Sequence, residues 1–542
     1  MFASVLGVLH TCMERIKRFD VQYGRQKGPI KPRATITPIA VVSILFFMWG
    51  LAYGLLGTYS VASEHPYGLV VNNLADIMNY HVKVAMGIGR GMAAGLAAGY
   101  YAAYIPGSLL IGGPLVKKCG YRVAMVVGLV TLAFGDLMMS FAAQGCSFAG
   151  MVAAHFIVGL GVSTLERSAN PYAVNCGPRM QAALRILIAQ AWAGIGTVVA
   201  PFLANAFVFN PDTSSRAPAA DPFNPGKCLM PVEDKASSCA NLGTVITFYR
   251  GVAGVIFVVS VLLAILLFRT KAVPEVEVPV PPAVDCGWKK WKHPLVSWRY
   301  SRVWWGVGAN FFNLGCQVTF AQFFIEHMKV NACASDAWAA ICMSIAQSAF
   351  VVGRFTAAAA VSTPKVKPRL VLVSFIGGAA AFTASGTSVT STAAIALAVL
   401  VMFWEAPSFP MIFESATADY EEWTSTCETL MILSISGGAV QPALMGQLVE
   451  SVGISNGWWL TTGCFLLVFT YPLATNVIPS YRRAVDRAVV AADDEEGKSQ
   501  HGPIQMVPST SSGEIEGVEP TFEPPIRPKY NGVWSRGRSR QV

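Results

Sequence analysis

Long apolar stretches, separated by short polar segments, recur along most of this chain. A helix needs roughly 20 apolar residues to cross the hydrocarbon core of a bilayer. Stretches of about this length begin near Pro38, Gly91, Tyr121, Phe148, Ala182, Gly243, Val303, Asp336, Arg369, Ser391, Thr424 and Gly457. They are too long to be the strands of a membrane barrel. The pattern predicts an all-α membrane protein with twelve transmembrane helices.

Composition agrees with this pattern. Of the 542 residues, 53% are hydrophobic and only 13% are charged, whereas about a quarter are charged in a typical soluble domain. The net charge of +9 does not indicate a nucleic-acid partner. The Lys and Arg residues lie in short segments between spans, where the positive-inside rule explains them. The expected partner is therefore the lipid bilayer.

The distribution of basic residues predicts the topology. Residues 1–36 contain seven Lys or Arg, and the segment from Arg269 to Arg302 contains another seven. The segment 209–242 instead has three basic and four acidic residues, as expected of an outward loop. Both termini are therefore expected in the cytoplasm. The turn between predicted helices 10 and 11 is an exception, because it has no Lys or Arg and its charged residues are all acidic: Glu414, Asp419, Glu421 and Glu422.

Polar segments divide the chain into five parts. The proline-bearing segment between predicted helices 6 and 7 separates the spans six and six, as a linker would. The C-terminal tail lacks the apolar residues needed to offset the entropy of ordering, so it is expected to be disordered and could be regulatory. The parts are a cytoplasmic segment 1–36, a six-helix bundle 37–268, a cytoplasmic linker 269–302, a second six-helix bundle 303–478 and a cytoplasmic tail 479–542.

The two halves repeat two spacings. Helix 5 has Gly196 and Pro201 in a G-x4-P-x-L pattern that helix 11 repeats at Gly437 and Pro442. Likewise, Glu166 in helix 4 and Glu405 in helix 10 each stand five residues before a proline. Duplicated halves are a feature of several transporter folds, so the repeats favour that class.

Twelve cysteines are scattered through the chain without a metal-binding spacing, so no metal site is expected. Most lie within spans, where Cys behaves as a small hydrophobic residue. Cys228 and Cys239 share the predicted outward loop. They could form a disulfide in an oxidising compartment or remain two free thiols.

Glu166 is the leading candidate for chemistry, because a charged residue at the centre of a span usually faces a cavity or a partner. Asn170 follows one turn later on the same helix face. Burial favours the neutral form of a carboxyl group, which would let Glu166 bind and release a proton. The alternative is a structural ion pair. The adjacent Arg167 points about 100° away along the helix, which disfavours direct pairing with it.

Helix 7 carries a second polar group. Asn310, Asn313 and Gln317 stand at i, i+3 and i+7 and share one face. Amides both donate and accept hydrogen bonds, as sugar hydroxyls require, although bonding between helices is an open alternative. Gln190 in helix 5 and Glu405 in helix 10 would face the same cavity.

Two further basic residues, Arg185 and Arg354, fall near predicted cytoplasmic helix ends. Long basic side chains at such ends snorkel or cap the helix. We therefore interpret both as structural or gating residues.

Several motifs together resemble the fucose-proton symporter family of the major facilitator superfamily. They cover residues 41–208 most clearly and 303–478 more weakly. They are FFMWGLAYGLL (46–56), GYYAAYIPGSLL (99–110), GLGVSTLERSANPYAVNCGP (159–178), RILIAQAWAGIGTVVAP (185–201), GRF (353–355) and GGAVQP in helix 11.

The resemblance implies the major facilitator fold and proton-coupled import of a monosaccharide. It implies that an Asp of helix 1 and the Glu of helix 4 carry the proton, and Glu166 matches that Glu. The helix 1 Asp normally follows the WGLAYGLL motif at once, whereas here nineteen residues, 57–75, precede Asp76. Removing them restores the pattern, so we interpret them as an insertion, and our hypothesis is that they are a retained intron of a fungal-type gene. Arg167 replaces a small residue of the family and would favour the ionised form of Glu166.

Taken together, the residues and the resemblance predict a transporter rather than an enzyme, with a sugar and a proton as partners and no cofactor. Asp76 and Glu166 are the expected proton carriers. The expected sugar ligands are Gln190, Asn313, Gln317, Asn170, Asn310 and Glu405. A facilitator without proton coupling and a non-transporting nutrient sensor remain open. The expected location is the plasma membrane rather than the vacuolar membrane. The protein is expected to be a monomer.

Overall fold

The computed structural model describes residues 36–55, 97–178, 181–208, 243–269, 276, 278, 300–334, 336–363, 366–420 and 423–486. All the named elements within these ranges are helices. The predicted insertion, the predicted outward loop with Cys228 and Cys239, the tail beyond residue 486 and Asp76 lie outside the described residues.

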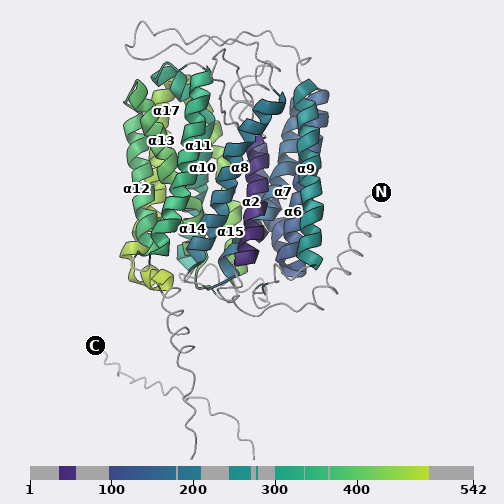
Figure 1. Cartoon of the computed structure of the whole chain (residues 1–542). Coiled ribbons are helices and arrows are strands. Elements are labelled where there is room, and N and C mark those ends of the chain that lie inside the picture. Colours follow the sequence, from purple (N-terminus) through teal and green to yellow (C-terminus); the bar gives the residue numbers. More distant parts are fainter. Residues whose placement is uncertain are drawn as a thin grey trace, which may run out of the picture. The chain divides into compact units, whose positions relative to one another are not determined.

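The first half of the chain forms one group of packed helices (Figure 1). Helix α2 packs on α8, and α6 packs on both α7 and α9. A short α-helical piece α5 and a π-helix η2 precede α6. The bounds are α2 (Ile36–Leu55), α5 (Tyr104–Pro106), η2 (Gly107–Gly112), α6 (Gly113–Gln144), α7 (Phe148–Asn175), α8 (Ala182–Val208) and α9 (Gly243–Arg269).

The second half forms a similar group. Helix α10 packs on α16 and α17, and α12 packs on α13 and α17. Helices α8 and α7 of the first half meet α11, α14 and α15 of the second. The bounds are α10 (Ser301–Asn331), α11 (Asp336–Ser362), α12 (Pro368–Gly386), α13 (Thr392–Glu405), α14 (Ser408–Thr417), α15 (Thr424–Leu433), η8 (Ser434–Ser436), α16 (Gly437–Val452) and α17 (Ile454–Val477).

Within the described residues, nine helices are long and apolar enough to cross a membrane. The described part of α2 forms a shorter apolar helix, Ile36–Leu51. Helix α10, which carries the predicted polar line of helix 7, is not among the nine. The prediction of an all-helical membrane protein is therefore confirmed at this coarser level.

One of the nine, Ala97–Gln144, runs for 48 residues. At 1.5 Å per residue a straight helix of that length would be about twice as long as the hydrocarbon core is thick. Gly120 interrupts it with φ +83° and ψ 175°, a backbone conformation that glycine adopts without steric cost. The break falls at the turn predicted between the second and third spans, so the stretch is two helices.

Close helix contacts explain the glycine that both halves repeat in the G-x4-P-x-L spacing. A Cβ atom on Gly196 of α8 would lie 2.4 Å from the carbonyl oxygen of Phe47 in α2. A Cβ atom on Gly437 at the start of α16 would lie 1.8 Å from the carbonyl oxygen of Phe311 in α10. Each glycine therefore lets its helix touch the backbone of the first helix of its own half, and a larger residue would force the pair apart.

The acidic turn between α14 and α15 has positive neighbours from both halves. Glu414 interacts electrostatically with Arg302, at the start of α10, and with Arg185 of α8. Arg302 also donates a hydrogen bond to the carbonyl of Ala418. Part of the unexpected negative charge in this turn is thus matched by arginines on neighbouring helices.

Candidate substrate cavity

A cavity of about 90 Å³ lies where helices of the two halves meet. One water molecule needs about 10–15 Å³ on this measure, so the cavity can hold a small polar solute or several waters. Its lining combines aromatic rings with a few polar groups from both halves. The polar and aromatic lining residues are Trp49, Tyr100, Tyr101, Tyr104, Glu166, Gln190, Thr197, Gln317, Gln347, Phe350, Arg354 and Phe409.

Glu166 is the acidic residue of this lining, and it is 3% exposed. The hydroxyl of Tyr104 donates to its Oε1 at 2.9 Å. The side-chain amide of Asn170, one turn later in α7, donates to its Oε2 at 3.2 Å. The amide of Gln190 in α8 donates in turn to Asn170 Oδ1 at 2.7 Å. Because both carboxyl oxygens accept a hydrogen bond, the site suits an ionised Glu166.

The irregular backbone before α6 places Tyr104 beside Glu166. The π-helix η2 follows Pro106, whose missing N–H prevents a regular α-helical bond. The Ser108 hydroxyl donates to the Tyr104 carbonyl at 2.6 Å and so fixes the turn that holds the tyrosine. Single π turns inside helices recur at functional sites. The motif GYYAAYIPGSLL contains these residues, but no pattern in it predicts that Tyr104 contacts Glu166.

Arg354 of α11 is the basic residue of the cavity. Its Nε donates to the carbonyl of Ala406 at 3.1 Å, and its Nη1 donates to the carbonyl of Gln190 across the junction of the two halves. Its guanidinium lies 4.5 Å from the centre of the Phe350 ring. Arg354 lies within the candidate span Ile341–Ser362 and lines the cavity, farther from the helix end than its position in the sequence predicted. Its interpretation as a structural or gating residue stays a prediction.

Two prolines explain why Arg354 finds a free carbonyl. Pro407 and Pro410 have no N–H, so the helix breaks between α13 and α14. Pro410 cannot donate to the carbonyl of Ala406, four residues earlier, and Arg354 supplies the missing donor. In the first half a single proline, Pro171, lies inside α7 and the helix continues past it.

The structure places the predicted site residues in three groups. Glu166, Gln190 and Gln317 line the cavity, and Asn170 lies directly behind it between Glu166 and Gln190. Asn310 instead donates to Ser434 Oγ at 2.8 Å, an interhelical bond of the kind left open above. Asn313 and Glu405 are buried but do not line the cavity. Asp76 lies outside the described residues.

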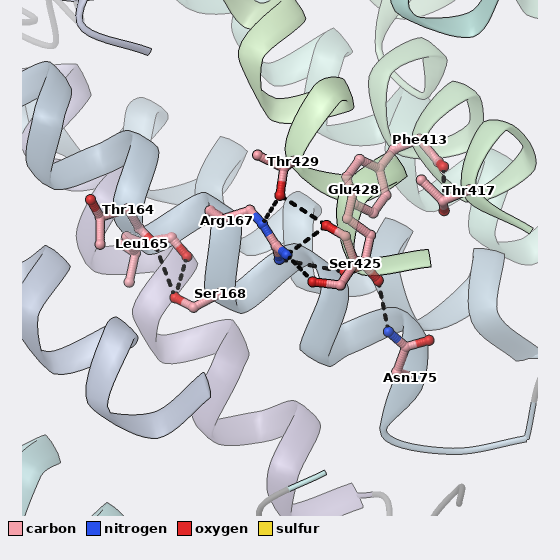
Figure 2. A network of polar contacts seen from close by, with 10 residues as sticks. All are labelled: Thr164, Leu165, Arg167, Ser168, Asn175, Phe413, Thr417, Ser425, Glu428 and Thr429. Carbon is pink, nitrogen blue, oxygen red and sulfur yellow. Dashed lines mark hydrogen bonds and ion pairs between the residues drawn. The ribbon is translucent and has the colours of Figure 1, made fainter. Parts of the chain in front are cut away.

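Arg167 points toward Ser425, Glu428 and Thr429 in the second half of the chain (Figure 2). Its guanidinium forms an ion pair with Glu428 of α15, with 3.4 Å between Nη1 and Oε2. Its Nε donates to Thr429 Oγ1 at 2.8 Å, and its Nη2 donates to Ser425 Oγ at 2.7 Å. Asn175, at the end of α7, donates to the other carboxyl oxygen of Glu428 at 2.8 Å. We call these five residues the Arg167 network.

The ion pair at the centre of the Arg167 network is buried, since the Arg167 and Glu428 side chains are 0% and 1% exposed. It connects α7 with α15. Glu428 was not predicted from the sequence. An acidic residue inside an otherwise apolar span was the available signal, but its partner lies 261 residues earlier in the chain.

A scan against family models matches residues 39–426 to the Major Facilitator Superfamily. The match covers well over half of the chain. This chain belongs to the Major Facilitator Superfamily. The membership agrees with the two groups of helices and with a cavity at their junction.

Two curated relatives show which members of the Major Facilitator Superfamily this chain is similar to. A glucose/galactose transporter of Brucella abortus is 25% identical over 436 residues, which cover 80% of this chain and 92% of the relative. The L-fucose-proton symporter of Escherichia coli is 22% identical over 443 residues, 81% of this chain and 93% of the relative. The resemblance drawn from the motifs is thereby confirmed.

A solved structure shows the same fold. The crystal structure of the Major Facilitator Superfamily transporter FucP, in the outward conformation, matches with a TM-score of 0.60 and 20% identity. The match covers 81% of this chain and 99% of FucP.

Proposed function

We propose that this protein imports a monosaccharide together with a proton, by alternating access between two six-helix bundles. The observation that carries the proposal is Glu166, a buried carboxyl that lies on a cavity between the two halves and is held there by Tyr104 and Asn170. The named relatives carry glucose, galactose or L-fucose, the last with a proton, so a hexose or 6-deoxyhexose is the proposed substrate class. Twelve spans with both termini in the cytoplasm, divided at residues 269–302, complete the proposed arrangement.

The cavity is suited to a sugar because its polar groups are few and placed on aromatic surfaces. Gln190 and Gln317 come from opposite halves and offer amides that can donate to and accept from hydroxyl groups. Trp49, Phe350 and Phe409 supply flat apolar faces for the C–H side of a sugar ring. We propose the two glutamines as sugar ligands. Asn170 acts through Gln190 and Glu166, because it is hydrogen-bonded to both of them.

The proton cycle follows from the surroundings of Glu166. With the carboxylate ionised, Tyr104 and Asn170 stabilise it and Arg354 provides a nearby positive charge. Proton binding from the outside neutralises the Glu166 carboxylate, which lowers the cost of closing the cavity around the loaded site. Release on the cytoplasmic side restores the carboxylate. Asp76 is the second proposed proton carrier.

The first experiment measures uptake of labelled L-fucose, D-galactose and D-glucose by the protein in proteoliposomes, at acidic and alkaline external pH. We expect faster uptake of at least one sugar in acid and a rise in external pH when that sugar is added. Uptake without pH dependence would identify a facilitator. Binding without uptake would favour a nutrient sensor.

The segment 57–75 can be tested separately. We expect the spliced transcript to lack its nineteen codons, and we expect the protein without it to transport sugar at the higher rate, because Asp76 then follows Leu56 within the first helix. The measurement is transcript length across codons 50–80, followed by uptake with both forms. Equal pH-dependent uptake by the full-length form would overturn the insertion hypothesis.

Replacing Tyr104 by phenylalanine removes the hydroxyl that donates to Glu166 and leaves the ring in place. A hydrogen bond to a charged group is worth about 1.5–3 kcal/mol. We therefore expect the pH profile of uptake to move to higher pH, because a carboxylate that has lost a donor takes up a proton more easily. Tyr101→Phe is the matched control. It removes a hydroxyl from another ring of the same cavity, whereas the two donors to Glu166 are Tyr104 and Asn170.

A further inference from the structure

Glu405, the last residue of α13, is the second buried carboxyl near the cavity, and the mechanism above does not use it. It is 2% exposed, and among the described residues neither of its carboxyl oxygens has a hydrogen-bond partner. A buried carboxylate without donors is much costlier than a buried neutral acid. In this conformation the surroundings of Glu405 therefore suit the protonated form, in contrast to those of Glu166.

The charged and titratable groups facing Glu405 come from two helices. Arg354 of α11 interacts with it electrostatically, as does the thiol of Cys316 in α10. On α12, Arg369 is occupied elsewhere, by Asp486 and Asn476. On α14, Glu414 interacts with Arg302 and Arg185. Among the described residues, Arg354 is thus the cation that acts on Glu405.

The same arginine acts on Glu166, so one positive charge serves two carboxyls. Around Glu166 the interacting groups are Tyr104, Asn170 and Arg354. Two ionised carboxylates with one guanidinium would leave an unbalanced negative charge in a buried site, which is strongly unfavourable. One ionised and one protonated carboxyl give a neutral set.

We propose that Glu405 is a further proton-binding residue, besides Glu166 and Asp76, and that it shares one proton with Glu166 under the control of Arg354. This inference rests on the proposed function. In the present conformation Glu166 is the carboxylate and Glu405 carries the proton. When Glu166 takes up a proton from the outside, Arg354 is left to Glu405, which then releases its proton on the cytoplasmic side. One proton enters the pair from the outside and one leaves to the cytoplasm, so the net charge of the site is the same before and after the exchange.

The backbone contacts of Arg354 link this exchange to movement of the bundles. Its Nε is bound to the carbonyl of Ala406, next to Glu405 in the same half, whereas its Nη1 reaches Gln190 in the other half. If α11 moves away from α8, the contact with Gln190 is lost and the contact beside Glu405 remains. Separation of the halves therefore favours an ionised Glu405 and a protonated Glu166.

The test uses Glu405→Gln, which keeps the size of the side chain and cannot ionise. Arg354 then has Glu166 as its one carboxylate, so Glu166 should be harder to protonate. We expect the pH profile of sugar uptake to shift to lower pH by about one to three units, the range expected for an adjacent unshared positive charge. Glu405→Asp, which restores a carboxyl, should return the profile toward that of the wild type. An unshifted profile in a folded Glu405→Gln protein would overturn the inference.

Asp136 of α6 provides a matched control. It is also buried, also lacks hydrogen-bond partners for both oxygens among the described residues, and interacts with Tyr249 rather than Arg354. Asp136→Asn should leave the pH profile of uptake in place. A shift equal to that of Glu405→Gln would mean that any buried carboxyl has this effect and would count against a specific role for Glu405.

A second measurement keeps Glu405 itself intact in case Glu405→Gln does not fold. Infrared spectroscopy of the purified protein at neutral pH detects the carbonyl stretch of buried neutral acids. Glu166→Gln should remove one such band, because Glu405 becomes the partner of Arg354 and ionises. Retention of every band would overturn proton sharing. A wild-type protein that transports sugar without moving protons would instead refute the proposed symport, so the two failures are distinguishable.

Discussion

Glu166→Gln is expected to abolish sugar accumulation against a gradient, while exchange of labelled for unlabelled sugar continues. The glutamine cannot release a proton, so the site stays neutral, like the protonated form of Glu166. This is the form in which the sugar-loaded protein changes conformation. Tyr104 and Asn170 now donate to the two carboxylate oxygens of Glu166. A glutamine offers only one acceptor oxygen in their place, because its NH2 group is itself a donor. Net uptake should therefore fall by about tenfold or more, consistent with the loss of a charge-assisted hydrogen bond.

The measurement compares net uptake driven by a pH gradient with exchange at equal pH on both sides of proteoliposomes. Glu166→Asp is the useful companion, because it keeps an ionisable carboxyl but withdraws it from Tyr104 by one methylene. It should keep some pH-driven uptake. If Glu166→Gln still accumulated sugar in response to acid, Glu166 would not carry the coupled proton.

Breaking the Arg167 network should open the end of the protein at which α7 meets α15. Glu428→Gln leaves Arg167 buried without its carboxylate, and removing one partner of a buried ion pair costs about 3–5 kcal/mol. That cost falls on the conformation in which the halves are joined and is relieved when they separate. The free thiol of Cys427, fully buried beside Glu428, reports the change directly. We expect its labelling rate by a small thiol reagent to rise by about tenfold or more.

An exposed pair within one half serves as the control. Asp486 pairs with Lys367 and Arg369, all in the second half, and is about a quarter exposed. Exposed pairs of this kind are worth about 0–1 kcal/mol, so Asp486→Asn should not change the labelling of Cys427. The double variant Arg167→Met/Glu428→Met removes both charges and should label more slowly than Glu428→Gln alone, because apolar replacement of a buried pair is often tolerated. Equal labelling of all four proteins would show that the network does not hold the halves together.

Local patterns predicted the helices and part of the cavity. The positions of Glu166, Gln190 and Gln317 followed from polar residues inside apolar spans, and the structure brings these three to one cavity. The duplicated spacings also have a physical cause, because Gly196 and Gly437 make equivalent close contacts. Signals of this kind depend on helix period and side-chain size, which a sequence displays directly.

Contacts between distant parts of the chain were not predictable in the same way. Arg354 was expected near a helix end from its position alone, yet it is held by the carbonyl of Ala406, which Pro410 leaves without a backbone donor. The sequence relates Arg167 only to its neighbour Glu166, whereas its ion-pair partner Glu428 lies in the other half of the chain. Such pairs depend on how the two halves meet, which no periodicity within one helix encodes.

The close backbone contacts at Gly196 and Gly437 have an evolutionary consequence. Substitution at these positions is costly because the neighbouring backbone has nowhere to move. The facing side chains of α8 and α11 that line the cavity, among them Gln190 and Gln347, are not restricted in this way. The preferred solute could thus change through substitutions of these cavity-lining side chains of α8 and α11, while the helix pairs that touch at Gly196 and Gly437 stay the same.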